Sequence, residues 1–551
     1  MKSKNYILTL TGILFSLMSF SAEYYIKPGD AMTGNDGSSW ESAITLSEFY
    51  EVYKTGGVFF SGDTFYFLGG TYYPTKIADG DSEQLMLGFN FIGGFDPAST
   101  GTVSEIPEYP SATPTIFSGD LNGSGKADVG DAGRLLLIRT NYLDDGGDKT
   151  PFVIQGFDFT CAYGLAANYN AGALWARRSI VTVKNCNFYN NESRDYGAGG
   201  CLMYGSYCHF VDCSFYNNKA KQSGAALRVA TNSNHVAYAI VERCSFYNNE
   251  VSGNYGGAVA NSSSSDFWLI NSTIVDNKAL SGGGGFVTNG GKIADNDIRK
   301  VYIISSTIAG NECMVNTEEG PALGTQIRFA QPPNVHIANS IVVAKTDNGT
   351  YSNSAMALTG TETEGFEFRS DGYNLLGSFT FAVENPTNVP NWLSSDMCGA
   401  ENTYAEVFGS NTLADNGGCT KTLALKEHIE GAWVEELETM LAEWGAPEGI
   451  DWTVDQRGHK RSPDGPSIGA IDMMAKDPTS ILKTSKNSIE ILSIERGLYS
   501  LSSPFNGIIK VFNINGMLVK SITDDTIIDL RDLSSGVYIA NIAGTSFKLI
   551  K

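Results

Sequence analysis

The hexapeptide CNFYNN at residues 186–191 recurs as CSFYNN at residues 213–218 and again at residues 244–249. Weaker copies begin at Ser272, Ser306 and Ser340. Successive copies start 27, 31, 28, 34 and 34 residues apart. A period of about 30 residues is typical of repeat architectures, in which each repeat packs mainly on its neighbours.

Each repeat contains three short apolar runs. In one repeat these runs are residues 200–202, 208–211 and 213–216, and none has the 3.6-residue period of a helix. Crossover connections between parallel strands are right-handed in almost all cases. We therefore predict an all-β fold, in which a right-handed parallel β-helix with three strands per coil is followed by a small C-terminal β-sandwich.

The alternation of side chains along a strand predicts which residues fill the interior. The first and third residues of each hexapeptide copy should face inward, which places Cys186 and Phe188 in two columns of stacked, uncharged side chains. The last Asn of each copy should form a ladder at the turn, because Asn tolerates left-handed backbone and its amide can bond the next coil. The ladder residues are Asn191, Asn218, Asn249, Asn277 and Asn311.

Composition and charge exclude several classes of protein. The chain has 551 residues and a net charge of −22, of which residues 23–475 carry −26 and residues 476–551 carry +2. This acidic balance argues against a nucleic-acid partner. Apolar residues make up 42 % and aromatic residues 11 %, which are too many for a disordered chain.

The N-terminus predicts export. Lys2, Lys4 and the apolar run 6–18 indicate a secretory signal peptide over residues 1–22. Because no later segment could cross a membrane as a helix, we expect an exported protein at the cell surface or in the extracellular medium.

Four segments are expected after the signal peptide. They are an N-terminal cap with the first coils (23–150), the central repeats (151–345), the last coils with a C-terminal cap (346–475) and the sandwich (476–551). Apolar spacing predicts an amphipathic helix near residues 426–444, which we expect to cover the open end of the solenoid.

Short β-runs separated by turn signals fill the C-terminal segment. The run 508–512 precedes an Asn515-Gly516 turn, and Ser535-Gly536-Val537-Tyr538 precedes a Lys-containing last strand. This order resembles the C-terminal sorting domain of the type IX (Por) secretion system over residues 480–551. The resemblance implies that the type IX machinery is a partner, in a Gram-negative cell. An ordinary terminal β-module is the alternative.

The two ends of the repeat region also resemble a known family. The segments 416–425, 455–458 and 468–472 are similar to the closing segment of secreted β-helix surface proteins of the choice-of-anchor Q type. Together with the coils and the strand-rich start, the resemblance covers about residues 24–475.

One loop has the order of oxygen ligands found in Ca²⁺-binding loops. The ligand positions are Asp120, Asn122, Ser124, Asp128 and Asp131. A polar turn without metal is the alternative, so Ca²⁺ is a candidate and no cofactor is certain.

An outward column could form a platform for flat sugar faces, since exposed aromatic rings suit such surfaces. The column contains His209, Trp268, Tyr302 and His336, and Trp175 and Arg228 lie outward on another strand. Coverage of these residues by long loops between coils is the alternative.

No catalytic arrangement of carboxylates, Ser/His/Asp or Cys/His is recognisable, and the fold alone is not evidence for catalysis. We therefore expect adhesion or binding of glycans or host-surface ligands. A polysaccharide lyase or glycoside hydrolase and a passive structural protein are the alternatives. The ladder cysteines are expected to be small buried hydrophobes, and an exported protein permits a disulfide between Cys398 and Cys419.

Overall fold

The fold is described from a computed structural model of the chain. The structure describes residues 21–74, 84–142, 146–164, 172–194, 199–230, 237–262, 265–289, 299–314, 324–331, 334–349, 354–359, 367–381, 390–447, 450–463, 465–475, 491–495, 498–501, 508–513, 518–523, 527–534, 537–542 and 545–550. The signal-peptide prediction lies almost entirely outside these residues. The chain forms two compact units, Met1–Lys476 and Asp477–Lys551, and the division falls where the charge changes sign.

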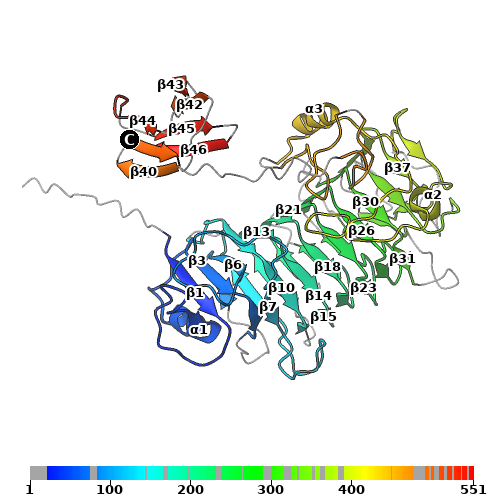
Figure 1. The fold of residues 1–551 in the computed structure, drawn as a ribbon. Coiled ribbons are helices and arrows are strands. Elements are labelled where there is room, and N and C mark those ends of the chain that lie inside the picture. Colours follow the sequence, from blue (N-terminus) through cyan, green and yellow to red (C-terminus); the bar gives the residue numbers. More distant parts are fainter. Residues whose placement is uncertain are drawn as a thin grey trace, which may run out of the picture. The chain divides into compact units, whose positions relative to one another are not determined.

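The first unit is a right-handed parallel β-helix (Figure 1), as predicted. Its described strands form four parallel sheets, here named A to D, and each complete coil visits them in the order A, B, D, C.

Sheet A contains β2 (Ile44–Thr45), β1 (Glu23–Lys27), β3 (Thr64–Leu68), β6 (Asn90–Phe95), β9 (Phe152–Gln155), β13 (Ile180–Lys184), β17 (Tyr207–Val211), β21 (Ala237–Glu242), β25 (Ser265–Ile270), β29 (Lys300–Ile304), β33 (Asn334–Ala338) and β36 (Phe368–Ser370). Sheet B contains β39 (Met397–Cys398), β37 (Leu375–Leu376), β34 (Ile341–Val343), β30 (Thr307–Ala309), β26 (Thr273–Val275), β22 (Ser245–Tyr247), β18 (Ser214–Tyr216), β14 (Asn187–Tyr189), β10 (Phe157–Thr160), β7 (Thr115–Ser118) and β4 (Gly70–Tyr72).

Sheet C contains β38 (Phe379–Phe381), β35 (Met356–Leu358), β32 (Ile327–Gln331), β28 (Phe286–Asn289), β24 (Val259–Ser262), β20 (Leu227–Ala230), β16 (Cys201–Tyr204), β12 (Leu174–Arg177), β8 (Leu136–Arg139) and β5 (Gln84–Leu85). Sheet D contains β11 (Tyr163–Gly164), β15 (Glu192–Ser193), β19 (Lys219–Ala220), β23 (Glu250–Val251), β27 (Lys278–Ala279) and β31 (Glu312–Cys313). The two-residue strands of sheet D are a fourth strand in each coil, where three were expected. They could not be predicted, because a run of two residues shows no alternation of side chains.

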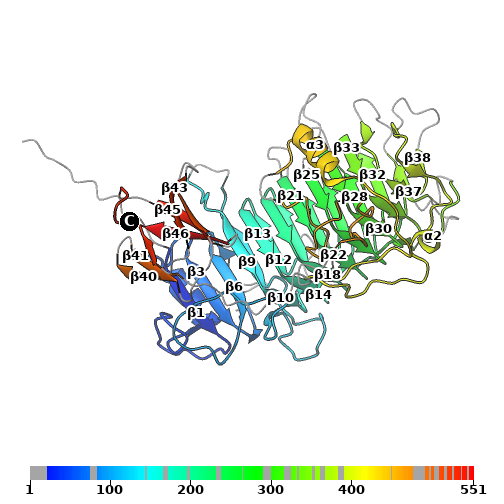
Figure 2. The ribbon, with the colours of Figure 1, turned by 45° about the horizontal axis from the view of Figure 1, so that its top comes forward.

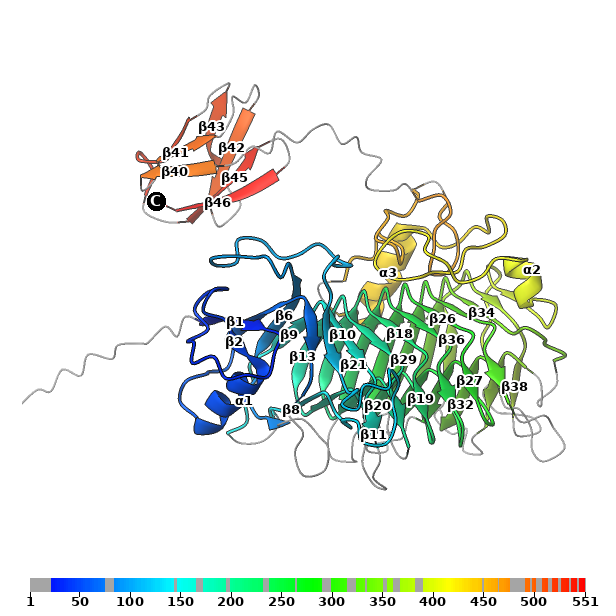
Figure 3. The same cartoon turned by 60° about the horizontal axis from the view of Figure 1, so that its bottom comes forward.

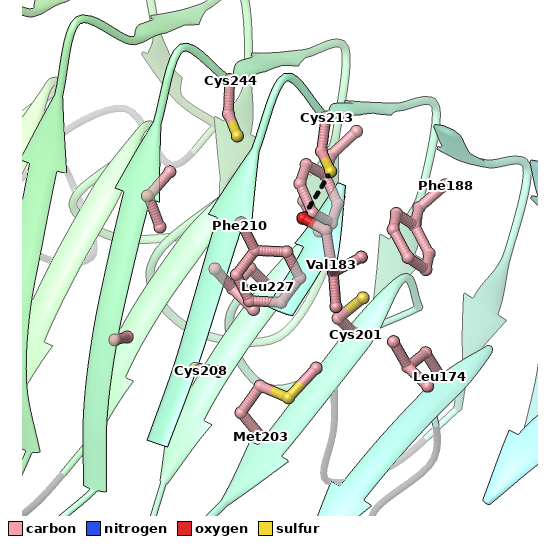
Figure 4. Packing of buried hydrophobic residues seen from close by; sticks show 14 of the residues in the cluster. Leu174, Val183, Phe188, Cys201, Met203, Cys208, Phe210, Cys213, Leu227 and Cys244 are labelled. Carbon is pink, nitrogen blue, oxygen red and sulfur yellow. Dashed lines mark hydrogen bonds between the residues drawn. The ribbon is translucent and has the colours of Figure 1, made fainter. Parts of the chain in front are cut away.

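The predicted inward columns fill the core (Figure 4). Cys186 and Phe188 are fully buried, and the ring centroids of Phe188 and Phe215 on the next coil lie 4.9 Å apart. The thiol of Cys213 lies 3.4 Å from the carbonyl oxygen of Val183. All nine cysteines are free thiols, so the disulfide between Cys398 and Cys419 is absent.

The asparagine ladder is continuous at the turn after sheet B. The side-chain nitrogen of Asn191 donates to the side-chain oxygen of Asn218 at 3.0 Å, and that of Asn218 donates to Asn249 at 3.0 Å. The backbone N–H groups of these residues bond the same oxygens. The left-handed residue is the preceding one, for example Asn217 with φ 55°, so the ladder residue itself supplies the amide bond only.

Three described helices accompany the solenoid (Figure 3). The helix α1 (Leu46–Thr55) packs Phe49 into the core at the N-terminal end, a region where only strands and turns were expected. The helices α2 (Tyr404–Phe408) and α3 (Val434–Trp444) follow the last coils. Within the described residues, no helix combines the length and apolarity needed to cross a bilayer.

The predicted amphipathic helix is shorter than residues 426–444 and covers another part of the solenoid. Figure 2 shows α3 beside β25 and β33 rather than across the open end. Its Leu437, Leu441 and Trp444 share one buried cluster with Trp268 and Tyr302 of sheet A. The expected end cap is therefore wrong, and the helix covers the lateral face of sheet A.

The second unit is a small antiparallel sandwich. One sheet contains β40 (Ile491–Glu495), β41 (Leu498–Leu501) and β44 (Ile527–Asp529), and the other contains β43 (Leu518–Thr523), β42 (Ile508–Asn513), β45 (Val537–Ile542) and β46 (Thr545–Ile550). Residues from both sheets, including Ile528 and Val511, form one buried cluster. The Asn515-Gly516 and Ser535-Gly536 turn predictions lie outside the described residues.

The ladder predicts a measurable stability difference between two adjacent asparagines. Asn218→Ala should lower the free energy of unfolding by about 1–3 kcal/mol, because it leaves the buried polar groups of two neighbouring coils without partners. Asn217→Gly is the control, because this exposed residue is left-handed and glycine keeps that conformation. Urea unfolding of the mature chain measures both, and equal losses would contradict the ladder's role.

Candidate functional site

The expected aromatic platform is buried. Trp268 and Tyr302 are only 2 % and 3 % exposed, and their ring centroids lie 3.7 Å apart. The Trp444 ring lies 5.4 Å from Tyr302 and 5.0 Å from His336. The cover is the C-terminal segment 404–475, here called the strap, and not the loops between coils. An exposed sugar platform at these residues is therefore wrong.

The two histidines of the column belong to polar pairs. His209 Nε2 lies 3.0 Å from a carboxylate oxygen of Glu242 on the next coil, and His336 Nδ1 lies 3.4 Å from Asp371. Both side chains are mostly buried. Their contacts hold neighbouring coils together.

The strap is fixed by polar side chains at the corner between sheets A and B. Asn339 accepts a hydrogen bond from the backbone N–H of Ala432 at 3.0 Å. The buried Arg461 guanidinium donates to the side-chain oxygen of Asn271 at 2.9 Å, and burial lowers its pKa. The segments 455–458 and 468–472 also dock on the coils, because the Gln456 side chain donates to the carbonyl oxygen of Cys244 and the Ala470 N–H donates to the Thr307 hydroxyl, both at 3.1 Å.

The loop proposed for Ca²⁺ uses its carboxylates in the turn itself. Both oxygens of Asp120 accept backbone N–H bonds, from Ser124 at 2.8 Å and Gly125 at 2.9 Å. Asp131 similarly accepts from Leu121 and Asp128. No group of three or more His, Cys, Asp or Glu side chains able to hold a metal occurs among the described residues. The carboxylates therefore stabilise the turn, and Ca²⁺ binding by this loop stays a prediction.

Sheet C carries the remaining two predicted ligand residues, Trp175 and Arg228. Inward residues of these strands, such as Leu174 and Leu227, are fully buried. Trp175 and Arg228 point outward in register with Leu202 between them, and both are half-buried. The sequence therefore placed these two side chains on the outer face correctly.

Two arginine guanidinium groups stack on aromatic rings at or beside this outer face. The Arg134 guanidinium lies 4.5 Å from the Trp175 ring centroid, and the Arg177 guanidinium lies 5.4 Å from that of Tyr204 on the next coil. Arg177 is also in register with Arg139. Such stacking is favourable and fixes the orientation of the guanidinium groups. Sequence reasoning missed Arg134, Arg139, Arg177 and Arg328, although the register of the strands implied three of them.

The charge on sheet C is opposite to that of its domain. The ten described strands of the sheet contain four arginines (Arg139, Arg177, Arg228 and Arg328) and no Asp or Glu. Residues 23–475 as a whole carry −26. Guanidinium groups can bind carboxylate and sulfate through paired hydrogen bonds. Several nitrogens of this face are buried, namely Nε of Arg177, Nε and Nη1 of Arg228 and Nη1 of Arg328.

A comparison with protein-family models agrees with the fold over part of the chain. A family model described as "Right handed beta helix region" matches residues 153–300. No curated protein matches the chain. A solved structure named "Rhamnogalacturonan lyase" aligns over 72 % of this chain and 92 % of that chain, with 12 % identity and a TM-score of 0.32.

The strap's contribution can be measured at Trp444. Trp444→Ala should cost about 3–5 kcal/mol of stability, because it leaves a cavity against Tyr302 and His336, and it should speed proteolysis of the strap. Trp433→Ala is the matched control, since that ring is 37 % exposed. Urea unfolding and limited proteolysis report the difference, and similar behaviour of the two variants would argue against a buried strap.

Proposed function

We propose that the protein is an exported surface protein that binds acidic polysaccharide along the outer face of sheet C. The observation that supports this proposal is the segregation of arginines, without any acidic residue, on the strands of one sheet in a strongly acidic domain. Without these arginines, long-range repulsion by the acidic domain would disfavour binding of an acidic polysaccharide.

The repeat geometry suits a polymer. Adjacent parallel strands lie about 4.8 Å apart, so outward side chains recur at regular intervals along the solenoid axis. Arg177 and Arg228 lie on strands separated by one intervening strand, β16. Arg177 and Arg228 already have partners in the protein, and Nε of Arg177 and Nε and Nη1 of Arg228 are buried, so an anionic group of the ligand would reach them through their remaining nitrogens. The half-buried Trp175, which shares β12 with Arg177, adds an apolar surface.

Binding without turnover is the leading proposal because the described strands of sheet C supply no carboxylate. Acid–base hydrolysis of glycosidic bonds requires a pair of carboxyl groups at the sugar. The alternative, a polysaccharide lyase or glycoside hydrolase, would reveal itself through new reducing ends or unsaturated products after incubation with acidic polysaccharides.

Substitution of the arginines tests the binding proposal. Arg177→Gln and Arg228→Gln should each weaken binding of polygalacturonate or dextran sulfate about tenfold, which is the effect of losing one charge-assisted hydrogen bond. Arg194→Gln removes the same charge near sheet D and serves as the control. Isothermal titration calorimetry at two salt concentrations measures the affinities, with neutral dextran as a further control. An unchanged affinity in both sheet C variants would refute the proposed site.

We further propose that the C-terminal sandwich is an export signal read by the type IX secretion machinery, and that the chain belongs with choice-of-anchor Q surface proteins. The order of strands and turns in residues 480–551 and the predicted signal peptide support this proposal. The separate compactness of the second unit is consistent with removal of this unit after export.

Deletion of the second unit tests the export proposal. A chain ending at residue 476, expressed in a type IX-competent Gram-negative cell, should accumulate in the periplasm, whereas the full chain should reach the surface. Cell fractionation and surface protease accessibility measure the distribution. Surface delivery of the truncated chain would contradict a sorting role.

A further inference from the structure

A cleft of about 250 Å³ opens on the outer face of sheet B, away from sheet C. Its floor is formed by residues of β10, β14 and the turns beside them, and its walls come from the loop around Tyr109 and from the strap. Its lining includes Tyr109, Pro110, Pro114, Asp158, Asn187 and Asp212. Pockets for drug-sized ligands measure about 300–1,000 Å³, so this cleft has room for a group the size of one sugar ring.

The walls of the cleft are firmly placed. A Cβ atom added to Gly156 would lie 2.3 Å from the Tyr109 ring, so this ring packs directly on the backbone of the coil. The Tyr109 hydroxyl donates to the carbonyl oxygen of Gly93 at 2.7 Å, and Ser111 donates to Gly94 at 2.7 Å. The thiol of Cys419 lies 3.6 Å from the carbonyl oxygen of Tyr109 and closes the cleft from the strap side.

The floor presents hydrogen-bond acceptors. Asp158 and Asn187 are neighbours on adjacent strands, and the amide nitrogen of Asn187 donates to one carboxylate oxygen of Asp158 at 2.7 Å. This bond leaves the second oxygen of Asp158 and the amide oxygen of Asn187 as acceptors. Asp212 is bound by the Arg243 guanidinium through two bonds of 2.8 and 3.0 Å. A carboxylate beside an amide is a suitable pair of partners for vicinal hydroxyl groups.

The charge of the cleft selects against an anionic ligand. Its ten lining residues include no cationic side chain and two carboxylates, of which Asp212 is paired with Arg243 behind the lining and Asp158 is bonded by a neutral amide. Burial raises the pKa of Asp158 even though Asn187 donates to it, which indicates that the cleft solvates negative charge poorly.

We infer that this cleft is a second binding site, which takes a single uncharged sugar residue through hydroxyl groups that donate to Asp158 and Asn187. Tyr109, Pro110 and Pro114 supply the apolar wall for the sugar's CH face. The site is independent of the arginines of sheet C, because the two sets of residues lie on different sheets. The ligand classes also differ, since one face selects anionic groups and the other a neutral ring.

Thiol footprinting of the mature chain tests this inference. Cys419 lines the cleft and Cys398 lies on β39, and both residues are exposed although their thiol groups are partly buried. Burial raises the pKa of Cys419 to about 11 and that of Cys398 to about 12, so both react slowly and can be compared. Labelling with a maleimide is followed by peptide mass spectrometry in the presence of methyl glycosides of glucose, galactose, rhamnose and galacturonic acid.

At least one neutral methyl glycoside should slow labelling of Cys419 severalfold at saturation, while labelling of Cys398 stays constant. The galacturonate glycoside should give no protection. Protection by galacturonate alone, equal protection of both thiols, or no protection by any neutral glycoside would each overturn the inference.

Two variants and one reverse experiment assign the effect to the cleft. Asp158→Asn keeps the size of the side chain but removes one acceptor oxygen. It should lower the affinity for the protecting glycoside about tenfold. Glu192→Gln on sheet D removes the same charge and should leave its affinity unchanged. Prior attachment of a bulky maleimide to Cys419 should abolish binding measured by calorimetry, and full binding to the labelled protein would contradict the location. Retained binding in Arg177→Gln would separate this site from the face of sheet C.

Discussion

Stacking of equivalent coils is the constraint on which the rest of this structure depends. A parallel coil buries its turn residues as well as its strands, so the polar groups at the turn after sheet B need partners in the neighbouring coil. Asn191, Asn218 and Asn249 meet this need by donating from one coil to the next. The same stacking places Phe188 on Phe215, so that ring contacts and amide bonds fix one register together.

Because the interior positions are uniformly uncharged and buried, ligand contacts are restricted to the outer faces. These faces are covered to different extents. The strap covers the later coils of sheet A, where Trp268, Tyr302 and Trp444 form a common core. Sheet C keeps half-buried arginines and aromatic rings on its outer positions. Sheet B opens into a cleft between the strap and the loop around Tyr109. The segments that cover the coils therefore decide which columns can meet a ligand.

Sequence reasoning was sufficient for features that repeat and insufficient for features that occur once. The inward columns and the asparagine ladder follow from alternation and a period near 30, and both are present. The prediction that Trp268 points outward was also correct. Its burial could not be predicted, because it depends on Trp444, which lies 176 residues later in the chain. The helix α1 was missed although Thr45 and Glu48 form a capping box, because the strand-like segments on both sides of it set the expectation for the whole region.

The distribution of charge follows from the separation of inward and outward side chains. Since inward positions are uncharged, the −26 of residues 23–475 must lie on outer faces, turns and loops. A random placement would put acidic residues on every sheet, yet the strands of sheet C contain only arginines as charged residues. Acidic surroundings weaken an isolated arginine's attraction for an anion, whereas Arg139 and Arg177, which are in register on adjacent strands, add their positive potentials. Sheet B, with Asp158 in its cleft, has the opposite local chemistry. One repeating scaffold can therefore present two chemically distinct binding surfaces, because coil stacking constrains only the side chains that point inward.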